Sequence, residues 1–148
     1  MIVYLADLAH DYLPARQFVP LGIGYLASYS NSIFGGKVEF HLFKSVDRLL
    51  DKCEACEPDL VGFANYTWNE RLNAFAGGRL RKRFPELPII MGGPNIDTDE
   101  KGIGDFLGIY PFVDVYCIYN GEISFSNIIQ HCLKNPTKKN QVETLRSA

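Results

Sequence analysis

Short runs of apolar residues alternate along the chain with stretches in which apolar residues recur every three or four positions. The first short run ends at Asp7, and the third is introduced by Pro58 and Asp59. Continuous apolar runs of this length are typical of strands that are buried on both faces of a sheet. The five predicted strands are Ile2–Ala6, Val38–Phe43, Leu60–Ala64, Ile89–Met91 and Val113–Ile118.

Amphipathic helices are predicted between and after these strands. Apolar stripes with helical spacing cover residues 23–34, 46–53, 72–80 and 125–133, and Gly35 and Gly36 end the first of them. Strands that alternate with helices imply a parallel sheet with helices on both faces. We therefore expect an α/β fold, a flavodoxin-like (Rossmann-type) three-layer sandwich with a five-stranded parallel sheet in the order 2-1-3-4-5.

Composition limits the chain to one domain and excludes several classes of protein. Its 148 residues include 47% apolar and 22% charged side chains, and its formal net charge is −2. These values are typical of a folded globular chain, and no basic stripe indicates a nucleic-acid partner. No apolar run reaches the roughly 20 residues that span a membrane, and the N-terminus lacks the basic lead of a secretion signal.

Two further expectations concern the location of the protein and its domain limits. Four cysteines, only two of them close together, favour a reducing compartment, so we expect a cytoplasmic protein. The apolar stripes stop before Pro136. We therefore place one domain at residues 1–134 and a polar tail, or the start of a linker, at residues 135–148.

The loops after the strands are the candidate ligand site, because ligands bind beyond the carboxyl ends of the strands in this fold class. Residues 7–20 form an unusually long loop, since most such loops have about 2–6 residues. The later loops contain Asn65-Tyr-Thr-Trp-Asn69, Gly92-Gly-Pro-Asn95 and Asn120-Gly-Glu122. These residues either only form turns or bind a large, flat ligand with polar edges.

Two short motifs are interpreted as structural. The segment from Gly22 to Ala27 matches the dinucleotide pattern G-x-G-x-x-G/A, but Gly22 follows Asp7 by fifteen residues instead of directly following the first strand. We therefore expect Gly22 and Gly24 to allow close packing of a helix on the sheet. The pair Cys53 and Cys56 ends a predicted helix, where the helix dipole does not favour a reactive thiolate.

Two other groups of residues lie where a reactive or metal-binding site could form. A phosphoacceptor receiver domain would have an aspartate after the third strand and a lysine after the fifth, where this chain has Ala64-Asn65 and Tyr119-Asn120. That function is therefore not expected. Asp7 and His10 lie together after the first strand. Such a pair can hold a metal, with the carboxylate orienting the imidazole, or can simply lie on the surface.

Taken in order, the loop sequences resemble a known family. The relevant stretches are Val19-Pro-Leu-Gly-Ile-Gly-Tyr-Leu-Ala27, Pro58-Asp-Leu-Val-Gly-Phe63, Tyr66-Thr-Trp-Asn69, Ile89-Ile-Met-Gly-Gly-Pro94, Val113-Asp114 and Gly121-Glu122. The ordered set is similar to the N-terminal cobalamin (vitamin B12)-binding domain of cobalamin-dependent radical S-adenosylmethionine (SAM) enzymes. The resemblance covers residues 1 to about 134.

The resemblance implies that a cobalamin lies across the carboxyl edge of the sheet. It places Gly92 and Gly93 beside the nucleotide tail of the cofactor and residues 65–67 near the same tail. It places residues 12–19 and Trp68 near the corrin face. The cofactor-binding residues expected on these grounds are Asp7, His10, Tyr12, Val19, Asn65, Tyr66, Thr67, Trp68, Gly92, Gly93, Pro94, Asn95, Gly121 and Glu122.

The sequence also departs from the family pattern. Relatives that ligate cobalt through histidine carry Asp-x-His-x-x-Gly, whereas this chain has Asp7-Leu-Ala-His10-Asp-Tyr12, so the resemblance does not extend to His10 as a cobalt ligand. The usual Gly-Glu-Gly-Glu is here Tyr119-Asn-Gly-Glu122, and position 64 is alanine where serine is frequent. These differences leave open a cofactor-free docking module of the same fold, or a nucleotide- or flavin-binding domain.

The resemblance implies that this chain binds the cofactor and that a different domain carries out the reaction. The C-x-x-x-C-x-x-C that holds the iron–sulfur cluster of radical SAM enzymes is absent from the 148 residues. The cluster and S-adenosylmethionine are therefore expected only in a partner domain. On this interpretation, the chain contributes no catalytic residue and supplies a bound corrinoid for chemistry such as methyl transfer.

Overall fold

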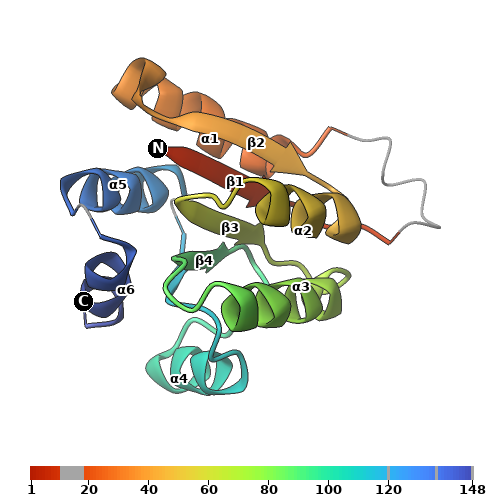
Figure 1. The fold of residues 1–148 in the computed structure, drawn as a ribbon. Coiled ribbons are helices and arrows are strands. Elements are labelled where there is room, and N and C mark those ends of the chain that lie inside the picture. Colours follow the sequence, from red (N-terminus) through yellow and green to blue (C-terminus); the bar gives the residue numbers. More distant parts are fainter. Residues whose placement is uncertain (11–18, 120, 136, 148) are drawn as a thin grey trace.

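A five-stranded parallel sheet forms the centre of the protein (Figure 1). A computed structural model describes residues 1–10, 19–119, 121–135 and 137–147. The strand order is β2-β1-β3-β4-β5, which confirms the predicted flavodoxin-like topology. The strands are β1 (Ile2–Ala6), β2 (Glu39–Phe43), β3 (Leu60–Ala64), β4 (Ile89–Gly92) and β5 (Val115–Cys117).

Helices cover both faces of the sheet. The two that pack on one face are α1 (Leu21–Phe34) and α5 (Gly121–Lys134). Those on the other face are α2 (Val46–Ala55), α3 (Glu70–Arg83) and α4 (Glu100–Ile109). A short 3-10 helix, η2 (Gly35–Lys37), follows α1, and α6 (Lys138–Arg146) packs beside α5 (Figure 1).

Alternation along the strands divides the core into two layers. Val3 and Leu5 of β1 point toward α1 and α5, and Tyr4 and Ala6 point toward the opposite layer. All four are almost fully buried. Burial on both faces explains why β1 is a continuous apolar run in the sequence. Because all five strands are parallel, every βα loop lies at the same edge of the sheet.

Helix α4 has no counterpart among the predicted apolar stripes. Its ten residues include three glycines, which weaken both the helical propensity and the hydrophobic pattern. Its start is fixed by Asp99, whose side chain accepts a hydrogen bond from the Gly102 N–H at 2.6 Å. Packing of Phe106 and Leu107 on the core stabilises the rest of the helix.

The segment predicted as a polar tail contains helix α6. It has no apolar stripe because polar contacts attach it to the domain. The buried Gln141 side chain donates to the Cys132 carbonyl at 3.0 Å and to the Asn135 carbonyl at 2.7 Å. The predicted polar tail thus contains a helix, and the domain limit near residue 134 stays a prediction.

Within the parts of the chain that the structure describes, no helix combines the length and the apolar character needed to cross a lipid bilayer.

A buried carboxylate at the start of β5 joins three elements. Asp114 accepts hydrogen bonds from the Ile89 N–H at 2.7 Å, from Arg81 at 2.6 Å and from Arg146 at 2.7 Å. The Asp114 side chain is fully buried, whereas both arginines reach solvent. This carboxylate therefore connects α3 and α6 to the sheet.

We predict that Asp114→Asn lowers the free energy of unfolding by about 3 kcal/mol, because it removes one charge of a buried ion pair and leaves Arg81 without its partner. Urea denaturation measures this change. Asp105→Asn is the matched control, since its pair with Lys101 is exposed, and it should change stability by less than about 0.5 kcal/mol. Equal effects of the two substitutions would contradict the assignment.

Candidate functional site

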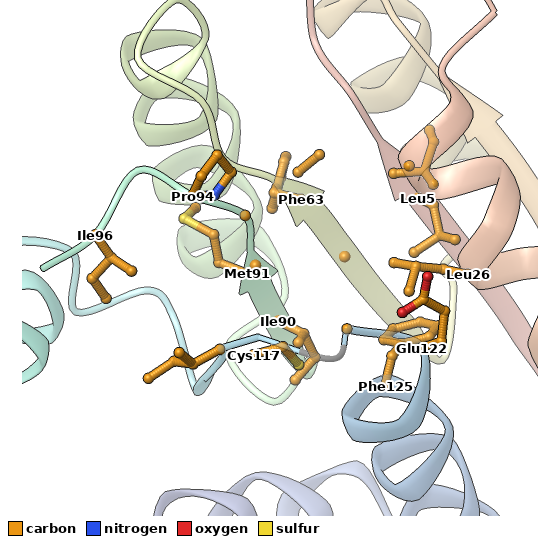
Figure 2. Close-up of a pocket in the computed structure, with 18 of the residues that line it drawn as sticks. Leu5, Leu26, Phe63, Ile90, Met91, Pro94, Ile96, Cys117, Glu122 and Phe125 are labelled. Carbon is orange, nitrogen blue, oxygen red and sulfur yellow. The ribbon is translucent and has the colours of Figure 1, made fainter. Parts of the chain in front are cut away.

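A cavity of about 520 Å³ opens at the carboxyl ends of the strands, on the sheet face that α1 and α5 cover (Figure 2). Figure 2 shows Leu26, Glu122 and Phe125 on one side of this space and Pro94 and Ile96 on the other. Most of its surface is apolar. Its position matches the crevice in which ligands bind to folds of this class.

A glycine forms the floor of the cavity. Gly62 of β3 pairs in register with Leu5 of β1 and with Ile90 of β4. A Cβ atom at Gly62 would lie 2.7 Å from the Leu5 side chain and 3.7 Å from the Phe125 ring. Because Gly62 has no side chain, the Leu5 side chain packs directly on the strand at this position, next to the Phe125 ring. Glycine inside a strand often marks a site where another group approaches the backbone closely.

The paired glycines after β4 form one wall. Gly93 has φ +130°, a backbone conformation that favours glycine, and a Cβ there would lie 2.4 Å from the Asn65 carbonyl oxygen. A Cβ at Gly92 would lie 3.2 Å from the Cys117 carbonyl oxygen. The Tyr116 hydroxyl donates to the Gly93 carbonyl at 2.9 Å and holds this turn against β5.

Three buried asparagines fix the loop after β3. The Asn73 amide donates to the Ala64 carbonyl at 3.1 Å and to the Asn69 amide oxygen at 3.2 Å. Asn69 in turn donates to Asp7 at 3.3 Å and accepts from the Tyr66 N–H at 2.9 Å. The loops after β1 and β3 are therefore joined by side-chain amides.

The third asparagine extends this network to β4 and β5. Asn65, which is fully buried, donates to the Asn95 carbonyl at 3.1 Å and to the Tyr116 hydroxyl at 3.3 Å. Its own amide oxygen accepts from Asn73 at 3.4 Å. Four strand ends thus share one hydrogen-bonded network, which holds the loops around the cavity in place.

Two carboxylates of this network have opposite pKa shifts. Burial raises the pKa of Asp7, and the charge of Lys44 and the hydrogen bond from Asn69 oppose this shift. The pKa of Glu70 is lowered, because its carboxylate accepts hydrogen bonds from the Tyr110 hydroxyl and the Asn95 amide. Glu70 thus connects the start of α3 to the loop before α4.

Of the predicted cofactor-binding residues, six line the cavity. They are Tyr66, Gly92, Gly93, Pro94, Gly121 and Glu122. Asp7, Asn65 and Asn95 do not line the cavity and belong to the hydrogen-bonded network that positions the loops around it. Their contact with a cofactor stays a prediction.

Thr67, His10, Val19 and Trp68 do not line the cavity. Thr67 donates to the Asn95 side chain at 3.3 Å on the surface. His10 is half-buried and does not line the cavity, and Val19 is exposed before α1. Tyr12 falls outside the described residues.

Aromatic side chains mark the mouth of the cavity. The rings of Tyr66 and Trp68 stack with their centroids 4.4 Å apart and an angle of 6° between their planes. Trp68 is 61% exposed and Tyr119 is 85% exposed. Tyr119 has φ +62°, an uncommon conformation for a large residue, which turns the chain directly after β5. Flat apolar surface is thus left open to solvent on both sides of the mouth.

The sequence did not reveal the cavity floor or the helix faces that enclose it. The lining residues that were missed include Leu5, Gly22, Ile23, Leu26, Gly62, Ile90, Cys117 and Phe125. Most of them follow the same apolar pattern as core residues, so the pattern cannot separate the two roles. The one available signal was Gly62, a glycine in the middle of an apolar strand.

The glycines at the start of α1 differ from each other. Gly22 lines the cavity, and a Cβ there would lie 3.4 Å from the Tyr66 hydroxyl. A Cβ at Gly24 would meet no atom within 4 Å. The prediction that close helix packing explains both glycines is therefore wrong for Gly24.

The cysteines have structural environments. Burial raises the pKa of Cys53 to about 12, so its thiol stays protonated, and Cys56 is exposed just after α2. Across residues 1–10, 19–119, 121–135 and 137–147, no three histidine, cysteine or acidic side chains gather in an arrangement that could hold a metal ion.

We predict that Glu70→Gln destabilises the protein more at neutral than at acidic pH. The folded-state pKa of Glu70 lies below its ordinary value of 4.5, so the ionised carboxylate stabilises the fold above pH 4.5. That contribution is lost as the pH falls through the folded-state pKa. Urea denaturation of both proteins between pH 7 and pH 3 should show the stability difference shrinking below about pH 4.5. A constant difference would contradict the role given to Glu70.

Comparison with known proteins identifies two homologous enzymes. The cobalamin-dependent radical SAM methyltransferase TokK of Streptomyces tokunonensis is 25% identical over 118 residues, which cover 76% of this chain and 17% of that enzyme. The 2-(S-pantetheinyl)-carbapenam-3-carboxylate methyltransferase of Streptantibioticus cattleyicolor is 29% identical over 122 residues, which cover 79% of this chain and 17% of that enzyme. The chain thus spans about one sixth of the length of these relatives. No family model matches the sequence.

Solved structures share the fold. A cobalamin-binding protein from Desulfitobacterium hafniense superposes with a TM-score of 0.64 at 15% identity, covering 88% of this chain and 58% of that one. The methanol:cobalamin methyltransferase complex of Methanosarcina barkeri superposes with a TM-score of 0.67 at 11% identity, covering 99% and 50%. The receiver domain of RcsB from Salmonella enterica superposes with a TM-score of 0.63 at 11% identity, covering 96% and 97%.

The fold alone does not separate these classes, because receiver domains and cobalamin-binding proteins superpose equally well. The sequence matches do separate them, since both homologous enzymes are methyltransferases and one is named as cobalamin-dependent. The chain is homologous to cobalamin-dependent radical SAM methyltransferases and similar to the cobalamin-binding domain of such enzymes, as the resemblance in its sequence predicted.

Proposed function

We propose that this chain binds cobalamin at the carboxyl edge of its sheet and presents it to a catalytic domain. The observation that carries the proposal is the apolar cavity between α1, α5 and the strand ends, in a chain homologous to cobalamin-dependent enzymes. Cobalamin consists of a large corrin ring with amide groups around its edge and a nucleotide tail that ends in a flat, methylated base. The tail is the part whose shape and polarity suit the cavity.

The residues that line the cavity fit the nucleotide tail of cobalamin. Gly62, Gly92 and Gly93 line the cavity without a side chain, and the Leu5 side chain fills the place that a Cβ atom at Gly62 would take. The floor beside Gly62 is formed by Leu5 and Ile90, which suit the flat face of an aromatic base. About 520 Å³ can hold a nucleoside and excludes the much larger corrin ring.

The rim offers a surface for the corrin ring. Tyr119 lines the cavity and Trp68 stacks on the lining Tyr66, and both side chains are exposed. The exposed Leu21 and Tyr25 lie on α1, next to the lining residue Gly22 and two residues after Ile23. Such clusters are uncommon on the surface of an isolated domain and mark binding surfaces. On this proposal, Trp68, stacked on Tyr66, supports one face of the ring, as the resemblance implies.

The chain binds and orients the cofactor, and other protein groups carry out the reaction. When bound, cobalamin supplies a cobalt ion that can carry a methyl group. Glu122 and Tyr66 line the cavity. We assign His10 no role as a cobalt ligand, because the Asp-x-His-x-x-Gly spacing of histidine-ligating relatives is absent. The iron–sulfur cluster and S-adenosylmethionine are assigned to a partner radical SAM domain.

We predict that hydroxocobalamin binds this protein and raises its melting temperature. A ligand that binds only the folded state at 100 times its Kd adds about 2.7 kcal/mol of stability. Titration followed by the visible absorption spectrum gives the Kd, and thermal denaturation gives the stabilisation. An unchanged spectrum together with an unchanged melting temperature at high micromolar cofactor would overturn the proposal and leave the cofactor-free docking module.

A pair of variants in α1 tests whether the cavity is the site. Gly22→Leu places a side chain at the cavity wall, whereas Gly24→Leu places the same side chain where nothing lies within 4 Å. Filling a packed space costs about 1–3 kcal/mol, so Gly22→Leu should raise the Kd by roughly tenfold or more, and Gly24→Leu should leave it unchanged. Equal affinities of the two variants would place the ligand elsewhere.

A further inference from the structure

The inner part of the cavity is uniformly apolar. Leu5, Ile23, Ile90 and Phe125 line it, and each of these side chains is at most 2% exposed. They come from β1, α1, β4 and α5, so every element around the floor contributes a hydrocarbon surface. Figure 2 shows Leu5, Leu26 and Phe125 on the same side of this space.

Hydrogen-bonding groups are scarce at this depth. The strands beneath the floor are paired on both sides, β1 with β2 and β3, and β3 with β1 and β4, so their backbone groups are already used. Among the lining residues that the structure describes, Glu122, Thr98 and Tyr119 are exposed at the mouth. Tyr66 and Cys117 are the half-buried polar side chains of the lining.

Cys117 adds little polarity to the wall. Burial raises the pKa of its thiol to about 11, so the group is a neutral and weak hydrogen-bond donor at neutral pH. The Tyr66 ring is stacked on Trp68 toward the surface. A ligand group that reaches the floor is therefore surrounded by carbon atoms and by one protonated thiol.

Corrinoids share the macrocycle and differ in the base at the end of the nucleotide tail. Dimethylbenzimidazole presents two methyl groups on an apolar ring, whereas adenine presents an amino group and several ring nitrogens. Each polar atom that enters an apolar pocket without a partner loses its hydrogen bonds to water. A pocket of this kind therefore distinguishes the two bases by their polarity, although they are similar in size.

We propose that this cavity selects corrinoids whose tail ends in an apolar benzimidazole over corrinoids whose tail ends in a purine. The inference rests on the proposed function, because it concerns the same site. It adds that the discrimination is made by the floor of Leu5, Ile90 and Phe125 beneath α1. The macrocycle, common to all these ligands, contributes affinity and no selectivity.

The test compares three corrinoids by titration with the full chain. They are hydroxocobalamin, its analogue with adenine as the tail base, and cobinamide, which lacks the nucleotide. Visible absorbance gives each Kd, and the shift in melting temperature provides a second measurement. Hydroxocobalamin should bind about tenfold to a hundredfold more tightly than the adenine analogue, the range in which an apolar pocket rejects a polar near-isostere.

The possible outcomes separate the two proposals. If hydroxocobalamin binds and the adenine analogue binds equally well, the selectivity is overturned and the proposed function stands. If cobinamide binds as tightly as hydroxocobalamin, the tail does not occupy the cavity and the selectivity is again overturned. If none of the three binds, both proposals fail.

A conservative substitution tests the role of the wall. Cys117→Ser replaces the weak thiol donor with a hydroxyl of nearly the same size, so the preference for hydroxocobalamin over the adenine analogue should fall by severalfold. Cys56→Ser is the matched control, because Cys56 is exposed after α2 on the other side of the sheet. An unchanged preference in Cys117→Ser would place the tail base away from this wall.

Discussion

The arrangement of the site depends on one physical requirement, the pairing of buried amide groups at the carboxyl edge of the sheet. Asn65, Asn69 and Asn73 are almost fully buried, and a buried amide without partners is costly. Their mutual hydrogen bonds and those to Asp7 and Tyr116 connect the ends of four strands. Because these amides bond to one another and to the loops behind the cavity, the cavity itself can remain apolar.

The cavity depends on small residues rather than on reactive ones. Gly62 interrupts an apolar strand, and Gly93 adopts a backbone conformation that places its carbonyl against Tyr116. Together with Gly22 at the start of α1, these glycines line the cavity between the sheet and two helices without projecting a side chain into it. A domain built in this way is suited to holding a cofactor, and the chemistry belongs to the cofactor and to a second domain.

The sequence predicted most of the fold because burial on both faces makes parallel strands continuous apolar runs. It missed α4, whose three glycines weaken the pattern, and α6, which is attached by the polar contacts of Gln141 and Arg146. It brought the correct loops together but could not tell which side chains face the cavity. Asn65 and Tyr66 are neighbours, yet one is buried in the network and the other lines the cavity, and only tertiary packing decides this.

The central claim is that a corrinoid places its nucleotide tail between α1, α5 and Gly62. A crystal structure of the protein grown with cobalamin tests this claim most directly. We predict electron density for the tail base in the cavity that Leu5, Gly62 and Phe125 line, with the corrin ring over Trp68 at the rim. A cavity that stays empty while cobalamin is bound at another surface would contradict the claim.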